Sequence, residues 1–391
     1  MYLYLALLLP TYLLTISLLH HHTLTTHRKK YTHLTSNPYT MTLSESHSIL
    51  LTLLTKTYPL SFALSGQIAL IKSYSIASGT KLLVSTRRLS TNSGVGKRVE
   101  DTAIIFSEIL TSGVDSERGL RTLSKLNWIH AQYGNRIKNE EMIHTLALNV
   151  LGPLQWIERF EGRPLLEVER VAVFKYWREV GMRMGIHSLP GTLDELVLWA
   201  ADFEKREMVY SENNVKCLDA TVDLYMRPLP SFLRGLGRDI VASLLEKDVR
   251  VALGLSDPPS WISTLVEGIL YTRSYINAHL LSPRLTPASI TNNPNPLTGR
   301  IRRSKWAFEP WYVSESTWTS VLRKVLGLDL FMGRPVPGVE WESQGYLPEE
   351  LGPKEFRERS RGDVLLHAEK MGEYARQGGG AVLGCPFTLG R

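Results

Sequence analysis

The chain has 391 residues, of which 43% are apolar and 21% are charged, a composition typical of a globular protein with a sizeable core. Its net charge is +7, but the basic residues are spread along the chain and form no stripe interleaved with aromatic residues, so nucleic-acid binding is not indicated. The two cysteines, Cys217 and Cys385, form no CxxC pair, which excludes a disulfide framework and a thiolate zinc site.

The first 57 residues differ from the rest of the chain. Residues 1–19 carry no charged side chain and approach the length that spans ~30 Å of hydrocarbon. Three basic residues at 28–30 follow this apolar run, and the positive-inside rule then favours a membrane anchor with the main domain on the cytosolic side. A targeting segment is the second interpretation, because the region is rich in threonine and Glu45 is its one acidic residue; a wrongly assigned first exon is the third. We therefore expect residues 1–57 to be an anchor or targeting segment with a linker.

The remainder of the chain has a helical pattern from about residue 96 onward. Strand signals, which are alternating β-branched runs bounded by turns, are nearly absent. Apolar spacing, capping residues and helix breakers predict helices over 98–110, from Asp115 or Ser116 to about Tyr133, from Asn139 to Gly152–Pro153, from Pro164 to Gly185, from Thr192 onward behind a T-x-x-E capping box, and near 212–224, 231–252 and 260–280.

An apolar patch upstream and two loops downstream complete the pattern. Residues 61–71 are too few to span a membrane, so we expect a buried helix or a helix in the membrane surface. Pro-, Asn- and Ser-rich composition predicts a loop over 283–300, and a second loop is expected over 330–354. The expected fold is all-α: a single large helical domain over 58–375, preceded by a hydrophobic N-terminal helix and followed by a flexible tail over 376–391.

A histidine occupies the apolar face of the helix expected to end near residue 133. Leu123, Leu126, His130 and Tyr133 are three, four or seven residues apart and therefore share one side of an α-helix. A buried imidazole there must be hydrogen-bonded, paired as a cation, or bound to a metal. The ordinary interpretation is a core histidine that donates to a backbone carbonyl.

Polar residues on the preceding helix favour a lined pocket instead. Arg98 and Thr102 lie one turn apart on the same side as Ile105, and Asp101 borders that side. Together with His130 they form a set of polar groups on inward faces of neighbouring helices. The simpler interpretation of Arg98 and Asp101 is an i,i+3 ion pair on a solvated surface.

Other histidines and motifs add little. His144 lies four residues after Glu140, which suggests a local side-chain pair with a structural role. The chain contains no GxGxxG, GxxxxGK[ST], HExxH or GxSxG motif.

Five segments resemble a known family. The sequence is similar to the fungal ER-bound oxygenases of the mycophenolic-acid pathway type, which are distant relatives of the bacterial rubber-cleaving latex clearing proteins. The resemblance is carried by GKRVEDT (96–102), LNWIHAQY (126–133), NEEMIHTLAL (139–148), PLQWIERFEGRPLLEVE (153–169) and WREVGMRMGI (177–186), and more weakly by 58–84 and 345–356.

The resemblance implies an all-α domain with a globin-like helical core around haem b. His130 would match the axial iron ligand, and Arg98 and Thr102 would match polar groups close to the haem. The rubber-cleaving relatives carry a lysine at the place of Asp101, and the fungal relatives more often show tyrosine at the place of His144.

The activity implied is oxidative cleavage of a C=C bond in an apolar isoprenoid or meroterpenoid chain by dioxygen, at the endoplasmic reticulum membrane, with membrane lipid as a further partner. Catalytic roles would fall to Arg98, Asp101 and Thr102.

Two other hypotheses remain open from the residues alone. One is a cofactor-free lyase or hydrolase that uses His130 and Asp101 as an acid–base pair. The other is a non-catalytic, membrane-bound helical protein that binds lipid, with its polar residues satisfied in the core.

Overall fold

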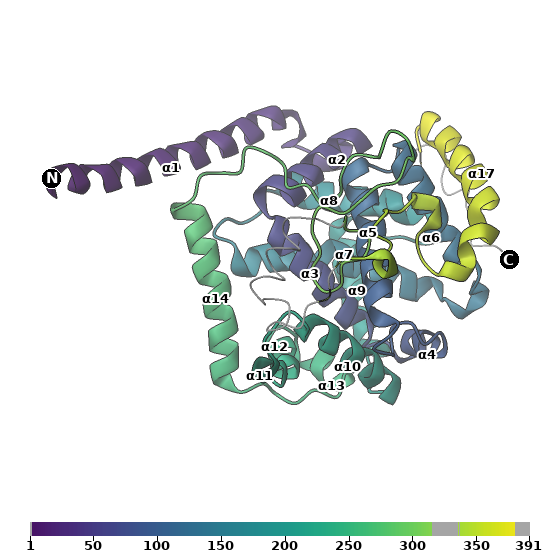
Figure 1. Ribbon diagram of the computed structural model, residues 1–391. Coiled ribbons are helices and arrows are strands. Elements are labelled where there is room, and N and C mark those ends of the chain that lie inside the picture. The colour runs from purple at the N-terminus through teal and green to yellow at the C-terminus, as the bar shows by residue number, and fades with distance from the viewer. Residues whose placement is uncertain (1, 315–334, 336, 380–391) are drawn as a thin grey trace.

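The chain folds into an all-α structure, as the sequence predicts. The computed structural model describes residues 2–314, 335 and 337–379, with side chains from residue 8 onward. Within these residues the backbone forms helices, short 3-10 turns and isolated β-bridges (Figure 1). The α-helices are α1 (Tyr2–Lys30), α2 (Leu43–Thr52), α3 (Pro59–Ser73), α4 (Ala77–Ser85), α5 (Val95–Ser112), α6 (Glu117–Ala131), α7 (Asn139–Phe160), α8 (Glu167–Arg183), α9 (Leu193–Glu207), α10 (Glu212–Met226), α11 (Ser231–Arg234), α12 (Gly237–Ser243), α13 (Lys247–Ala252), α14 (Ser260–His279) and α17 (Arg357–Arg376).

Capping residues start several of these helices. Ser116 accepts a hydrogen bond from the Gly119 amide at the start of α6, and Thr192 accepts one from the Glu195 amide at the start of α9. Such contacts satisfy amides that have no partner inside the helix. The predicted helix starts at these two caps are therefore confirmed. The expectation for 330–354 falls partly on 330–334 and 336, and most of the predicted tail falls on 380–391; these positions lie outside the described residues.

Helix α7 passes through Pro153, where the sequence predicted its end. A proline inside a helix removes one hydrogen bond and costs about 3 kcal/mol. Beyond it, Leu154, Trp156, Ile157 and Phe160 are all buried. Burial of one such side chain contributes about 1.5–3 kcal/mol, so together they outweigh the cost of the proline. The predicted stop was wrong because tertiary packing overrides the local preference.

The helix predicted over 231–252 is in fact three short helices, α11, α12 and α13. Gly235 ends the first, and Gly237 begins the second. A Cβ at Gly237 would lie 2.5 Å from Met226 Cγ, so this glycine lets α12 approach α10 closely. The break between α11 and α12 therefore allows α12 to pack closely against α10. A smaller difference occurs at α8, which begins at Glu167 and not at Pro164.

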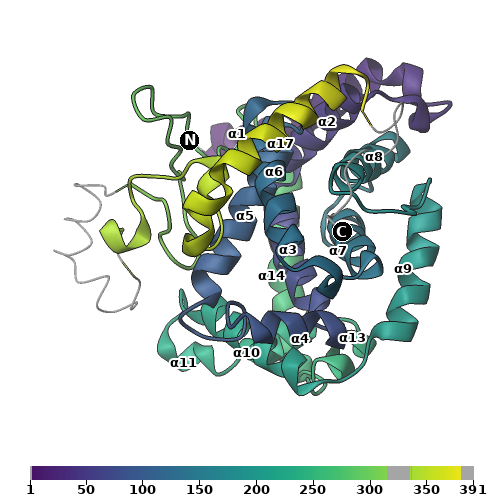
Figure 2. The ribbon, with the colours of Figure 1, turned by 90° about the vertical axis from the view of Figure 1, so that its right-hand side faces the viewer.

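Two hydrophobic cores support the fold. The larger is built around α2, α5, α6, α7 and α8, and the smaller around α10, α12 and the start of α5. Helix α5 contributes to both, because Ile104 and Ile105 belong to the larger core and Val95 and Val99 to the smaller. Figure 2 shows α5 and α6 side by side, with α17 lying along α6. Helix α5 thus joins the two cores, and α6 joins α5 to α17.

Three buried carboxylates fasten α5 to the C-terminal segment. Glu100 pairs with Arg303, Asp101 accepts a 2.8 Å hydrogen bond from Tyr312, and Glu108 accepts a 2.5 Å hydrogen bond from Tyr346. On the helical side, Lys97 pairs with Asp101 at 2.8 Å and Arg118 of α6 pairs with Glu108 at 2.5 Å. We call Glu100, Asp101 and Glu108 the α5 carboxylates. Their contacts set how α5 is rotated about its axis.

Helix α1 projects from one side of the body and ends in Arg28, Lys29 and Lys30 (Figure 1). In the part of the chain that the structure describes, no helix combines the length and the apolar character needed to cross a membrane. The predicted anchor therefore stays a prediction.

Removal of one α5 carboxylate should destabilise the fold strongly. Glu108→Ala leaves buried donors without an acceptor, and we expect a loss of about 3–5 kcal/mol in the free energy of unfolding. Tyr346→Phe should cost about 1–2 kcal/mol, because it removes one hydrogen bond. Glu117→Ala is the matched control: the Glu117 side chain is 78% exposed in its pair with Arg121, so less than about 1 kcal/mol should be lost. Urea unfolding followed by circular dichroism measures all three, and equal losses at Glu108 and Glu117 would contradict the assignment.

The buried Lys125 should make stability depend on pH. Its ammonium group contacts Ser360 Oγ at 2.6 Å, and burial, with Arg357 nearby, lowers the pKa of Lys125 to about 8. The unfolded chain keeps this proton up to about pH 10.4. Between these values the unfolded state holds a proton that the folded state has lost, so stability rises with pH. From pH 8 to 10.5 the wild type should gain up to about 3 kcal/mol relative to Lys125→Met in urea unfolding, and parallel curves would refute this.

Candidate active site

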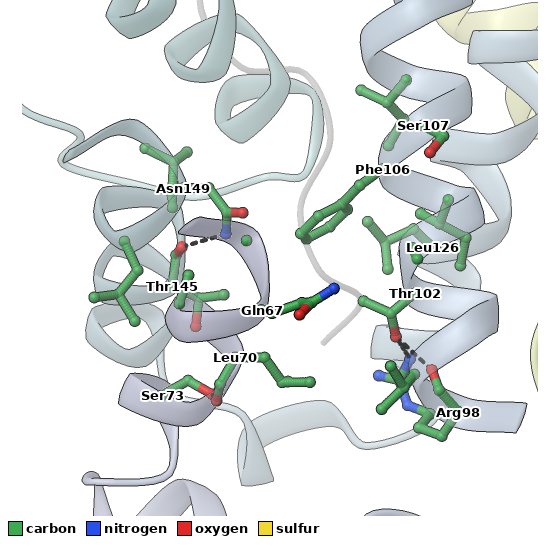
Figure 3. A pocket seen from close by; sticks show the side chains of 18 of the residues that line it. Gln67, Leu70, Ser73, Arg98, Thr102, Phe106, Ser107, Leu126, Thr145 and Asn149 are labelled. Atoms are coloured by element: carbon green, nitrogen blue, oxygen red, sulfur yellow. Dashed lines mark hydrogen bonds between the residues drawn. The ribbon is translucent and has the colours of Figure 1, made fainter. Parts of the chain in front are cut away.

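A cavity of about 620 Å³ lies where the two hydrophobic cores meet. Its walls come from α3, α4, α5, α6 and α7, and from the segment around residues 288–308. Most of the lining is apolar. Figure 3 shows Phe106 of α5 directed into the space, with Leu70 of α3 and Leu126 of α6 on either side. The volume is that of a typical small-molecule site, which ranges over about 300–1,000 Å³.

His130, in the last turn of α6, lines this cavity. Its Nδ1 atom is buried and has no hydrogen-bond partner among the described residues. Burial, together with the positive charge of Arg98, lowers the pKa of His130 to about 4. The imidazole is therefore neutral at physiological pH. A neutral ring is the form in which histidine binds a metal ion.

Arg98 and Thr102 line the cavity one turn apart on α5, as the sequence predicts (Figure 3). Arg98 Nη1 donates to Thr102 Oγ1, and that hydroxyl donates to the Arg98 carbonyl at 2.7 Å. Among the described residues no carboxylate forms an ion pair with Arg98. Burial lowers the pKa of Arg98, although a guanidinium remains protonated. Among the described residues that line the cavity, Arg98 is thus a guanidinium without an ion-pair partner, beside a neutral imidazole. The negative charge of Asp101 partly offsets the effect of burial on the pKa of Arg98.

Asp101 lies elsewhere. It is not among the described residues that line the cavity, and its carboxylate is held by Lys97 and Tyr312 on another side of α5. Its partner is therefore Lys97 at i−4 and not Arg98 at i−3, because the lysine can reach the buried carboxylate together with the tyrosine hydroxyl. The structure does not bring Asp101 to His130. The acid–base pair of the lyase hypothesis is thus not formed.

An ion pair at the cavity escaped the sequence analysis. Glu100 is buried, Arg303 has an 11% exposed side chain, and the two pair with each other and both line the cavity. Burial lowers the pKa of Arg303 to about 10, with a smaller opposite effect from Tyr346. The two residues are 203 positions apart, and Arg303 follows a stretch that reads as a loop. No local sequence signal could therefore have predicted this ion pair.

His144 also lines the cavity, but its partner differs from the expected one. Its Nε2 atom lies 3.2 Å from Glu204 Oε1 of α9, whereas Glu140 had been expected. The pKa of Glu204 is lowered in spite of burial, because the contact with His144 favours the carboxylate. Across the cavity, Gln67 of α3 extends toward Thr102 (Figure 3). Gln67 could have been noticed as the one amide within the apolar patch 61–71.

Comparison with known proteins identifies the family. Residues 76–270 match the profile described as "ER-bound oxygenase mpaB/B'/Rubber oxygenase, catalytic domain". ER-bound oxygenase mpaB' of Penicillium brevicompactum is 27% identical over 328 residues, which cover 78% of this chain and 77% of the relative. ER-bound oxygenase mpaB of the same fungus is 26% identical over 305 residues, covering 74% and 71%. ER-bound oxygenase mpaB of Penicillium roqueforti is 27% identical over 210 residues, covering 50% and 70%. The chain therefore belongs to the ER-bound oxygenase mpaB and rubber oxygenase family, and it is an oxygenase.

Proposed function

We propose that this oxygenase depends on haem b and cleaves a C=C bond in an apolar isoprenoid or meroterpenoid chain. The reaction consumes one dioxygen molecule, breaks the double bond and leaves a carbonyl group on each carbon. The observation that carries the proposal is the neutral imidazole of His130, whose Nδ1 has no hydrogen-bond partner among the described residues, beside Arg98 and Thr102 on the wall of an apolar cavity.

The residues present fit a haem. In the described ranges no three or more His, Cys, Asp or Glu side chains gather into a group that could hold a metal ion. A haem iron needs far less from the protein, since one axial histidine is sufficient. Buried polar atoms are normally hydrogen-bonded, and Nδ1 of His130 has no partner among the described residues, which supports our proposal that the ring interacts with a bound group.

Each residue then has a physical task. His130 would hold the haem iron, and the haem would supply the redox chemistry with dioxygen. Arg98 offers a positive charge, held in place through Thr102, to any negative charge on the cofactor or on oxygen in the site. The apolar walls exclude water and bind the hydrocarbon chain of the substrate. Asp101 contributes by positioning α5 through Lys97 and Tyr312.

We further propose that the enzyme works at the endoplasmic reticulum membrane, with its main domain over 58–375 in the cytosol. The names of the relatives describe them as ER-bound. An isoprenoid substrate dissolves in lipid, so a membrane-associated enzyme can take it from the bilayer. The uncharged residues 1–19 followed by basic residues at 28–30 support an anchor in this orientation.

Loss of His130 should abolish haem binding. The full chain, produced with haem available, should show a Soret band and one iron per chain, and His130→Gly should lose both. Added imidazole should restore the band in His130→Gly, since it can occupy the space of the missing ring. His144→Gln is the matched control, because His144 lines the same cavity but is bonded to Glu204. A wild type without a Soret band, or an unchanged band in His130→Gly, would refute the proposal.

A side chain added at Gly79 should narrow the cavity. Gly79 of α4 lines the cavity, and a Cβ built there meets no atom within 4 Å. We expect Gly79→Leu to weaken binding of a three-unit isoprenoid alcohol roughly tenfold, about 1.4 kcal/mol, while a one-unit alcohol binds as before. Spectral titration of the haem measures both affinities.

The control is Gly362→Leu on α17, where a Cβ also meets no atom and which does not belong to the lining of this cavity. Replacing a helical glycine should favour folding in both variants, so weaker binding cannot be ascribed to unfolding. Equal effects of the two substitutions would show that the cavity does not hold the chain.

A further inference from the structure

Helix α14 is attached to the body through its charged residues. Arg273 pairs with Glu161 at 2.5 Å, Glu267 pairs with Arg159, and Ser274 donates to Glu161 at 3.3 Å. Glu267 and Arg273 are the only charged side chains of the helix apart from His279 at its end. A helix on a water-soluble surface normally turns its charged face outward. Here both charges serve the attachment to α7 and the residue that follows it.

The outward face of α14 is correspondingly apolar. At 100° per residue, Trp261, Leu265, Ile269, Ile276 and Leu280 fall within one stripe, and each is 38–59% exposed. Tyr271 and Tyr275 border the stripe and are also exposed. No Asp, Glu, Lys or Arg lies on it. An exposed apolar patch of this extent marks an interaction surface.

The stripe continues into α1. Tyr12 of α1 donates a 2.7 Å hydrogen bond to the Leu280 carbonyl, and His20 Nε2 lies 3.0 Å from the Leu281 carbonyl. The two helices meet at one corner of the molecule (Figure 1). Leucines exposed on several sides of α1 extend the surface: Leu8, Leu9, Leu14, Leu18 and Leu19. Residues 1–26 contain no Asp, Glu, Lys or Arg.

We propose that the outward face of α14 lies in the surface of a lipid bilayer, beside α1. The inference rests on the membrane association proposed above and adds a second point of contact. A folded protein partner would cover one side of α1, whereas hydrocarbon can surround a helix that is apolar on several sides. Basic residues follow both helices, at 28–30 after α1 and at Arg284 after α14, where they can meet lipid headgroups. Trp261, Tyr271 and Tyr275 on α14 belong to the two residue types that are enriched at the membrane interface.

A fluorescent probe on α14 tests this placement. In the full chain, Leu265→Cys carries an environment-sensitive nitrobenzoxadiazole label, and Leu198→Cys on α9 is the matched control, because Leu198 is an exposed leucine on a helix outside this surface. Both proteins also carry Cys385→Ser, so that the label does not react at that position. The native Cys217 is buried and therefore protected from the label. Phosphatidylcholine vesicles that contain about one fifth phosphatidylserine, whose anionic headgroups attract basic residues, are then added. We expect a blue shift and brighter emission for the label at 265 and no change at 198.

Separate outcomes distinguish this inference from the proposed function. If the protein sediments with the vesicles but the label at 265 is unchanged, α14 does not contact the bilayer, while membrane association by α1 stands. If the protein stays in the supernatant, both fail. A shift at 265 that grows with protein concentration in the absence of lipid would assign the face to a second copy of the chain, and the inference would be wrong.

Charge placed on the stripe provides an independent measurement. Leu265→Glu with Ile269→Glu should lower the vesicle partition coefficient at least tenfold, because ionised carboxylates resist transfer toward hydrocarbon. Leu198→Glu should leave it unchanged. The Soret band of both proteins should match the wild type, since neither substitution touches the cavity. Equal partitioning of the two variants would overturn the inference.

Discussion

The rotation of α5 about its own axis is the constraint on which the rest of the structure depends. Glu100, Asp101 and Glu108 are buried on this helix, and each is bound to a side chain of the C-terminal segment. Removing one partner from a buried pair costs several kcal/mol, so these contacts strongly resist any turn of the helix. With α5 held in this way, Arg98 and Thr102 face the cavity. The same contacts keep the segment that carries Arg303 against the cavity wall.

The apolar surroundings of the cavity also determine the protonation state of His130 and the strength of the electrostatic field of Arg98. An imidazole surrounded by apolar atoms and close to a guanidinium has its pKa lowered, and His130 therefore stays neutral well into the acidic range. The same low polarity strengthens the field of Arg98, because few water dipoles screen it. A hydrophobic cavity in which His130 Nδ1 has no hydrogen-bond partner and Arg98 has no ion pair among the described residues suits oxygen chemistry on a hydrocarbon better than hydrolysis. This agrees with membership in an oxygenase family.

Much of the fold follows from local sequence signals, because helix periodicity and caps depend on neighbouring residues. Local signals were sufficient to predict the helix starts at Ser116 and Thr192 and the approximate extent of α5 and α14. They also placed Arg98, Thr102 and His130 on inward faces. Contacts between residues that are far apart in the sequence could not be predicted in this way. Asp101 borders the inward side of α5, and its carboxylate is held away from the cavity by Lys97 and by Tyr312, which is 211 positions away. The continuation of α7 past its proline likewise depends on a core that no local window contains.

That proline has a chemical consequence inside the cavity. Because Pro153 has no N–H, it cannot donate to the carbonyl oxygen of Asn149 four residues earlier, as a standard helical residue would. Both residues belong to the cavity lining. The main chain there lacks one of its usual internal bonds, which leaves a lone pair of the Asn149 carbonyl without its helical donor in surroundings that are mostly hydrocarbon. An apolar molecule with an alcohol or phenol at one end would gain a hydrogen bond by placing its hydroxyl at this carbonyl oxygen. The missing helical donor at Pro153 would thus favour one orientation of a molecule that is otherwise hydrocarbon.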